Sequence, residues 1–154
     1  MAKIDKHQVP VDSGTRYPPP HDAPCKGRKW QRLGDAAGLT QFGVSVFHLP
    51  PGVWSSQRHW HTHEDEFVYV LRGELVLVTD AGEELLLAGD CAGFPAGTRN
   101  GHCLQNRSSA DAEILVVGSR NEEDHGEYSD IDMTFMPRRY SGRGGYRRKD
   151  GTPL

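Results

Sequence analysis

Short apolar runs separated by turn-forming residues are the feature that most limits how this chain can fold. They follow one another from Phe42 to Gly118, with proline or glycine at most of the breaks, as in Pro50-Pro51-Gly52 and Pro95-Ala96-Gly97. We expect strands over the ranges 42–49, 53–61, 66–72, 74–79, 84–87, 91–94, 102–106 and 113–118. Strands this short and closely spaced pack into sandwiches or barrels, and no long stretch has helical periodicity. The chain is therefore predicted to be all-β.

Three histidines at alternate positions indicate a metal site within this β-structure. His59, His61 and His63 stand shortly before Glu66. Residues two apart in a strand point to the same face, so two of these imidazoles can meet a carboxylate at one point. Imidazole and carboxylate together hold divalent transition metals. The pair is either His59 with His61 or His61 with His63. The first is favoured, because His63 stands too close to Glu66 for a turn between the strands. His63 then lies at the rim of the site or is a solvated loop histidine.

Composition excludes several classes of protein. The length of 154 residues indicates one domain, which can bury a stabilising hydrophobic core without a disulfide or other cross-link. A net charge of −3 argues against nucleic acid as a partner. Cys25, Cys91 and Cys103 do not form a disulfide framework, which indicates a reducing compartment. No apolar run approaches the length of a membrane span, and Met1 to Pro10 lacks the apolar segment of a signal peptide. We therefore expect a cytoplasmic protein with no membrane partner.

The two ends of the chain differ from its centre. Residues 1–40 are proline-rich and predict an extended arm with a short helical turn near Gly34 to Gly38. Residues 41–120 form the predicted barrel. Residues 121–154 form a tail, whose basic cluster over 138–149 we interpret as pairing with the acidic stretch before it or packing across a subunit. The apolar residues of the tail are expected to fold back onto the barrel; they are Tyr128, Ile131, Met133, Phe135, Met136 and Tyr140.

Two motifs in the central region resemble those of the cupin superfamily. In the first, His59-x-His61 is followed after four residues by Glu66 and after six more by Gly73. In the second, Gly89 precedes Pro95-Ala96-Gly97, and His102 is followed after three residues by Asn106. The chain departs from the family pattern in two places. Gly52 lies one residue too far before His59, and four residues instead of two separate Gly97 from His102.

The resemblance implies a double-stranded β-helix, the small jelly-roll barrel of cupins, with the N-terminal arm and C-terminal tail added to it. It implies that His59, His61, Glu66 and His102 bind one divalent transition metal per chain, with Zn, Ni, Fe and Mn as the candidates. Four protein ligands leave open positions for a small-molecule ligand or substrate. Isomerase, lyase and dioxygenase chemistry all fit, and the alternative is a non-catalytic cupin that binds or senses a sugar or carboxylate. The resemblance also implies a homodimer, and it assigns no catalytic residue.

Several residues near the motifs are expected to have structural roles. Glu64 and Asp65 are interpreted as exposed turn acids, and Cys103 as a core thiol. Arg99 and Asn100 either stabilise the enlarged turn before His102 or line the pocket mouth. His48 could face the barrel interior or be a core histidine whose hydrogen bonds are satisfied. Trp60, Phe67 and Tyr69 are interpreted as packing residues. Trp60 and Phe67 would pack between sheets or at a dimer interface.

Overall fold

A computed structural model describes residues 3–154 and shows an all-β chain. The helical elements are short: η1 Lys6–Gln8, η2 Ala23–Cys25 and α1 Leu33–Ala36. The strands are β1 Val11–Ser13, β2 Lys29–Arg32, β3 Phe42–Leu49, β4 Glu66–Arg72, β5 Glu74–Thr79, β6 Gly82–Leu87, β7 Cys91–Phe94, β8 Cys103–Gln105, β9 Ala112–Ser119, β10 Gly126–Glu127, β11 Thr134–Phe135 and β12 Tyr146–Arg147. Across residues 3–154, no helix has the length and apolarity that a membrane span requires.

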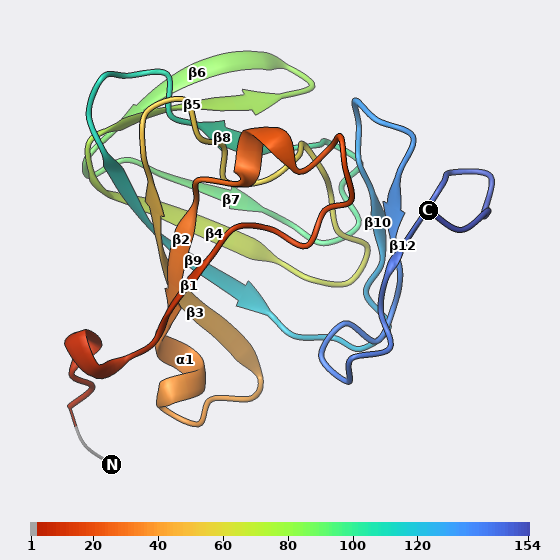
Figure 1. The fold of residues 1–154 in the computed structure, drawn as a ribbon, viewed down its shortest axis with the longest axis horizontal. Coiled ribbons are helices and arrows are strands. Elements are labelled where there is room, and N and C mark those ends of the chain that lie inside the picture. The colour runs from red at the N-terminus through yellow and green to blue at the C-terminus, as the bar shows by residue number, and fades with distance from the viewer. Residues whose placement is uncertain (1–2) are drawn as a thin grey trace.

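The strands form three antiparallel sheets. The largest has the order β1-β2-β3-β9-β4-β7, and a second has the order β6-β5-β8. The third, β10-β11-β12, belongs to the tail and stands at one end of the barrel (Figure 1). The arm crosses the barrel and adds β1 and β2 to the edge of the largest sheet, beside β3. The position of the domain boundaries near residues 40 and 120 stays a prediction.

Alternating side chains decide which face of the largest sheet is buried. In β4, Val68 and Val70 are buried, whereas Phe67, Tyr69 and Leu71 are each more than a third exposed. The buried face packs against the β6-β5-β8 sheet and forms one core. Its members are Leu49, Val68, Val70, Leu75, Leu77, Leu86, Leu104, Ala112 and Ile114. Burying a side chain of this kind contributes about 1.5–3 kcal/mol, so this core supplies much of the stability of the barrel.

A second apolar cluster joins the arm to the tail. It consists of Tyr17 and Cys25 from the arm with Tyr128, Met133 and Phe135 from the tail. The Tyr17 and Tyr128 rings meet edge to face, with centroids 5.4 Å apart. The prediction that the apolar residues of the tail fold back is confirmed for the three tail members of this cluster and for Ile131, which packs against it. The arm and tail thereby close one end of the barrel.

The strand predictions are correct for most of the barrel but wrong for 53–61. Within residues 3–154 this segment forms isolated bridges instead of a strand: Trp54 pairs with Gln105, and His59 pairs with both His102 and Tyr128. Between them the Ser55 hydroxyl accepts a hydrogen bond from the Leu104 N–H at 3.0 Å, where a regular ladder would use a backbone carbonyl. The segment therefore pairs with β8 at its ends and bends between them.

Candidate functional site

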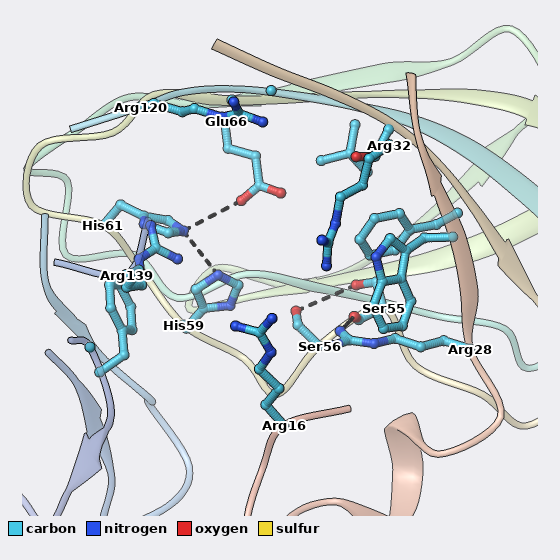
Figure 2. A pocket seen from close by; sticks show the side chains of 18 of the residues that line it. Arg16, Arg28, Arg32, Ser55, Ser56, His59, His61, Glu66, Arg120 and Arg139 are labelled. Carbon is cyan, nitrogen blue, oxygen red and sulfur yellow. Dashed lines mark hydrogen bonds and ion pairs between the residues drawn. The ribbon is translucent and has the colours of Figure 1, made fainter. Parts of the chain in front are cut away.

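A cavity of about 760 Å³ lies where the inner face of the largest sheet meets the arm and the tail. Its apolar lining comes from both cores and includes Val68, Ile114 and Tyr128. Figure 2 shows three of the predicted metal ligands on its polar lining, His59, His61 and Glu66, with the arginines around them. A cavity of this volume suits a small ligand. The full set of predicted ligands, His59, His61, Glu66 and His102, contributes to the lining.

Separate elements position these four residues. Glu66 is the first residue of β4, and His102 directly precedes β8. His59 and His102 exchange backbone hydrogen bonds of 3.2 Å and 2.9 Å, which fixes the two histidines opposite each other. His61 follows two residues later, beyond Trp60, whose backbone N–H bonds the Glu127 carbonyl of the tail. Segments far apart in sequence thus deliver their side chains to one wall of the cavity.

The hydrogen bonds of His59 and His61 leave two nitrogen lone pairs facing each other. His59 Nδ1 lies 2.9 Å from the Gln57 carbonyl oxygen, and His61 Nδ1 lies 2.8 Å from Asp124 Oδ2. Both partners can only accept a hydrogen bond, so each Nδ1 carries a proton, and in the neutral form of each ring the lone pair is on Nε2. The two Nε2 atoms nevertheless lie 3.1 Å apart. Two lone pairs at this distance repel unless a proton or a metal cation lies between them, and in the neutral rings the arrangement fits a metal ion.

Glu66 completes a cluster with the spacing of metal ligands. Its Oε2 lies 3.6 Å from His61 Nε2 and 3.1 Å from His102 Nε2. Ligands about 2.1 Å from one metal ion are about 3.0 to 3.4 Å apart in tetrahedral or octahedral geometry. The ligand atoms of His59, His61 and Glu66 all lie within 4.8 Å of one another, close enough to hold a metal ion.

His102 joins this cluster through Glu66. Its ring stacks on Phe94, with centroids 3.6 Å apart and planes 2° from parallel. Its Nδ1 is buried and has no hydrogen-bond partner within residues 3–154, so the imidazole interacts with polar groups through Nε2. Its ring centroid is 4.9 Å from that of His59 but 6.5 Å from that of His61. His102 therefore borders the three-residue cluster, and its role as the fourth ligand stays a prediction.

Electrostatics gives the cluster the charge state of a metal site. Burial lowers the pKa of His59 well below its usual value, and the neighbouring His61 and His102 lower it further. Burial raises the pKa of Glu66, but the hydrogen bond with His102 and the charges of the three histidines outweigh this and hold it well below its usual range. At neutral pH the cluster thus offers neutral His59 imidazole together with the Glu66 carboxylate, the donors that divalent transition metals prefer.

His63 is outside the cluster. Its side chain is exposed, its Nδ1 lies 2.8 Å from the Thr62 hydroxyl, and its ring is 5.8 Å from that of His125. It is not among the residues that line the cavity. Of the two histidine pairs that the sequence left open, His59 with His61 is the one that meets Glu66. His63 has the position of a loop histidine.

A second group of acids and histidine lies behind His61, and the sequence did not predict it. Glu64 is only 5% exposed and Asp124 is fully buried, so the prediction that Glu64 is an exposed turn acid is wrong. Arg139 Nη2 donates to Glu64 Oε2 at 2.5 Å and to Asp124 Oδ2 at 2.9 Å. The Tyr140 hydroxyl donates to Glu64 at 2.8 Å. The Arg139 guanidinium is therefore the cation that these two carboxylates bind. The second group as a whole supports His61.

Other sequence expectations have clear outcomes. His48 does not face the interior; its imidazole lies 3.4 Å from Asp111 and 3.6 Å from Glu113 at the surface. Asn100 accepts the Asp80 backbone N–H at 2.9 Å, which is turn chemistry. Arg99 lies over the Trp60 ring at 5.3 Å and does not line the large cavity. The expectation that Cys103 is a core thiol is confirmed, since it is 1% exposed.

Comparisons with known proteins identify the family. The family model described as "Cupin domain" matches residues 45–118. A cupin-superfamily sugar phosphate isomerase from Silicibacter pomeroyi is 46% identical, with 99% of this chain and 96% of that chain covered and a TM-score of 0.95. A putative sugar phosphate isomerase from Acidithiobacillus ferrooxidans is 27% identical, with 83% and 80% covered and a TM-score of 0.75.

A third solved structure resembles this chain in its fold. The polyketide cyclase RemF from Streptomyces resistomycificus is 23% identical, with 77% of this chain and 79% of that chain covered and a TM-score of 0.63, and it shares the fold. No curated protein matches the chain. The predicted double-stranded β-helix is confirmed, and this chain belongs to the cupin superfamily.

Proposed function

We propose that this protein is a metal-dependent isomerase that acts on a small phosphorylated sugar. The observation that carries the proposal is the pair of imidazole Nε2 atoms of His59 and His61, 3.1 Å apart, on the wall of a cavity that five arginines line. The facing imidazole nitrogens favour a bound cation, and the arginines favour an anionic ligand. Two similar proteins named as a sugar phosphate isomerase and a putative one, the first 46% identical over nearly the whole chain, support the same substrate class.

His59, His61, Glu66 and His102 are the proposed ligands of one divalent metal per chain, with Zn, Ni, Fe and Mn as candidates. The two histidine Nε2 atoms and Glu66 Oε2 would hold the ion, and His102 Nε2 would complete the set. When bound, the metal would supply Lewis-acid polarisation of a substrate carbonyl or hydroxyl oxygen. The hydrogen bonds from His61 to Asp124 and from His59 to Gln57 would keep both rings oriented for binding.

Glu66 is the residue best placed to move a proton. Aldose–ketose isomerisation transfers a proton between two adjacent carbons, and this requires a base beside the substrate. Among the described residues that line the cavity, only Glu66 and Asp35 carry carboxylates, and Asp35 is paired with Arg120. Oε2 of Glu66 faces the histidines, whereas its other oxygen points into the pocket (Figure 2). We propose that Oε1 takes the proton from one carbon and returns it to the next.

The test combines metal analysis with proton exchange. The purified protein is expected to contain close to one metal ion per chain, and His61→Ala and His102→Ala should each lose it. Aldose and ketose phosphates incubated with the metal-loaded protein in D2O should interconvert with deuterium entering at the carbon that exchanges, as followed by NMR. Glu66→Gln should reduce this exchange by at least about a hundredfold, within the range of losses that removal of a general base produces.

His63→Ala is the matched control, because it removes an exposed imidazole from the same segment. It should retain both the metal and the exchange. Binding of sugar phosphate without turnover would instead identify a binding or sensing cupin, and oxygen consumption by the iron-loaded protein would identify a dioxygenase. Full metal content in both His61→Ala and His102→Ala would exclude the proposed ligands.

We also propose that the protein is a cytoplasmic homodimer. The three cysteines are free, Cys25 and Cys103 buried and Cys91 exposed, which suits a reducing compartment. Burial raises the pKa of both Cys25 and Cys103 to about 11, so neither is a reactive thiolate at neutral pH. The dimer is supported by an exposed apolar face of the largest sheet, on which Phe67, Tyr69 and Leu71 are each more than a third exposed.

A further inference from the structure

The five arginines that line the cavity differ in how much charge they leave for a ligand. Three of them are already paired with carboxylates. Arg32 lies 3.5 Å from Asp12, Arg120 pairs with Asp35, and Arg139 pairs with Glu64 and Asp124. Each of these three cations is compensated by an acid within the chain, so a bound anion would have to compete with a carboxylate for it. The remaining two are Arg16 and Arg28.

Arg28 is fixed in place entirely by neutral groups. Its guanidinium donates to the Gly14 carbonyl at 2.9 Å, to the Ser55 carbonyl and to the Thr15 hydroxyl at 3.5 Å. Its guanidinium carbon lies 5.2 Å from the centre of the Trp30 ring. Carbonyl oxygens and aromatic faces orient a guanidinium without cancelling its charge. Arg28 is therefore a rigid cation beside the cavity, with no acidic partner in residues 3–154.

Arg16 reaches the cavity from the arm. Its side chain is exposed, and within the described part of the chain it has neither a hydrogen bond nor an ion pair. Tyr17, the next residue, is buried between Tyr128 and Tyr146 and anchors this part of the arm. In the view of Figure 2 the Arg16 guanidinium points from the arm toward the part of the pocket that His59 and Ser56 line, opposite Glu66 and Arg120.

We propose that Arg16 and Arg28, with the Ser56 hydroxyl, bind the phosphate of the substrate; this rests on the proposed function, which supplies the substrate class. A phosphate monoester carries about −1.5 to −2 charges at neutral pH and accepts paired hydrogen bonds from guanidinium groups. Within residues 3–154 the Ser56 hydroxyl has a single side-chain hydrogen bond, with Ser55 Oγ at 3.5 Å, which leaves it able to donate to a phosphate oxygen. The carbonyl end of the substrate then lies at Glu66 and His61.

Inorganic phosphate is the probe, titrated into the metal-loaded protein by calorimetry at low ionic strength. Arg16→Ala should weaken phosphate binding about tenfold or more, the effect of losing one charge-assisted hydrogen bond or two. Arg147→Ala removes the same charge from an exposed side chain of β12 that does not line the cavity, and it should leave the affinity unchanged. Because Arg16 is exposed, its variant should fold like the parent, and equal melting temperatures would verify this.

Repeating the titration after chelation of the metal separates the two anion sites that the cavity offers. Phosphate binding that survives chelation and depends on Arg16 supports the proposal. Binding that is lost with the metal and indifferent to Arg16→Ala overturns it, because the phosphate would then be held by the metal. No turnover is needed for this measurement. An inactive protein with Arg16-dependent phosphate binding would refute the isomerase while leaving the phosphate subsite intact.

Discussion

At the scale of single residues, Asp124 determines whether His61 can act as a ligand. The carboxylate is fully buried, and it accepts hydrogen bonds from His61 Nδ1 at 2.8 Å and from the His63 backbone N–H at 2.9 Å. Burial raises its pKa, but the hydrogen bonds and the charges of His61 and Arg139 outweigh this, so the pKa is lowered and Asp124 stays ionised at neutral pH. An ionised acceptor at Nδ1 leaves the lone pair of His61 on Nε2, where the metal is proposed to bind.

Asp124→Asn is therefore expected to weaken metal binding by about 10- to 100-fold, the usual range for losing a carboxylate that orients a histidine ligand. An amide can present its NH2 group to His61 and favour the wrong tautomer, while the overall shape is kept. Competition with a chromophoric chelator measures the affinity. Asp130→Asn, which alters an exposed partner of Arg58, is the control and should bind metal as before. Equal affinities in the two variants would show that Asp124 does not orient His61.

At the scale of elements, the loop between β11 and β12 supports the proposed metal site from behind. Arg139 belongs to this loop, bridges Glu64 and Asp124, and lies over the Phe135 ring at 4.7 Å. Burial lowers the pKa of Arg139, but the two carboxylates and nearby tyrosines outweigh this and raise it above its usual value, so the guanidinium stays charged. A single cation thus connects the tail to the segment that carries the histidines.

Arg139→Ala would leave two carboxylates close together without a cation, and we expect the free energy of unfolding to fall by about 3 kcal/mol, as for a broken buried ion pair. For a chain of this length that corresponds to a melting temperature lower by roughly 6–12 °C. Arg143→Ala, an exposed change in the same loop, should melt like the parent. A differential scanning calorimetry trace that is unchanged for Arg139→Ala would mean that the bridge contributes little.

Individual elements show which parts of the fold could be predicted from the sequence and which could not. The strands 42–49 and 66–72 are correct to the residue because apolar alternation and turn glycines both mark them. Gly73 shows why: its φ is +78°, and a Cβ there would lie 2.8 Å from the Asp111 carbonyl oxygen. The segment 53–61 could not be predicted, because its isolated bridges are made with Gln105, His102 and Tyr128, which lie far along the chain. Glu64 could not be assigned either, since Arg139 lies 75 residues further along the chain.

At the scale of the whole molecule, the outer face of the largest sheet is apolar and uncovered. Phe67, Tyr69 and Leu71 of β4 are 41%, 38% and 45% exposed, so Phe67 does not pack between sheets as one of the two sequence interpretations held. On β9, Val117 is paired with Phe67 and Leu115 with Tyr69, and on β3 Val44 and Val46 continue the same row. A contiguous apolar face of this kind marks an interaction site on a protein surface.

A second copy of the chain is the partner that fits this face, because a flat apolar patch can be self-complementary about a twofold axis. We expect light scattering to give twice the chain mass of 17.1 kDa. Phe67→Glu should shift the protein to monomer, because each interface would then bury two unpaired carboxylates. Leu85→Glu, at a residue of β6 that is 55% exposed, is the control and should remain dimeric. A dimer that persists in Phe67→Glu and dissociates in Leu85→Glu would move the interface to the β6-β5-β8 sheet.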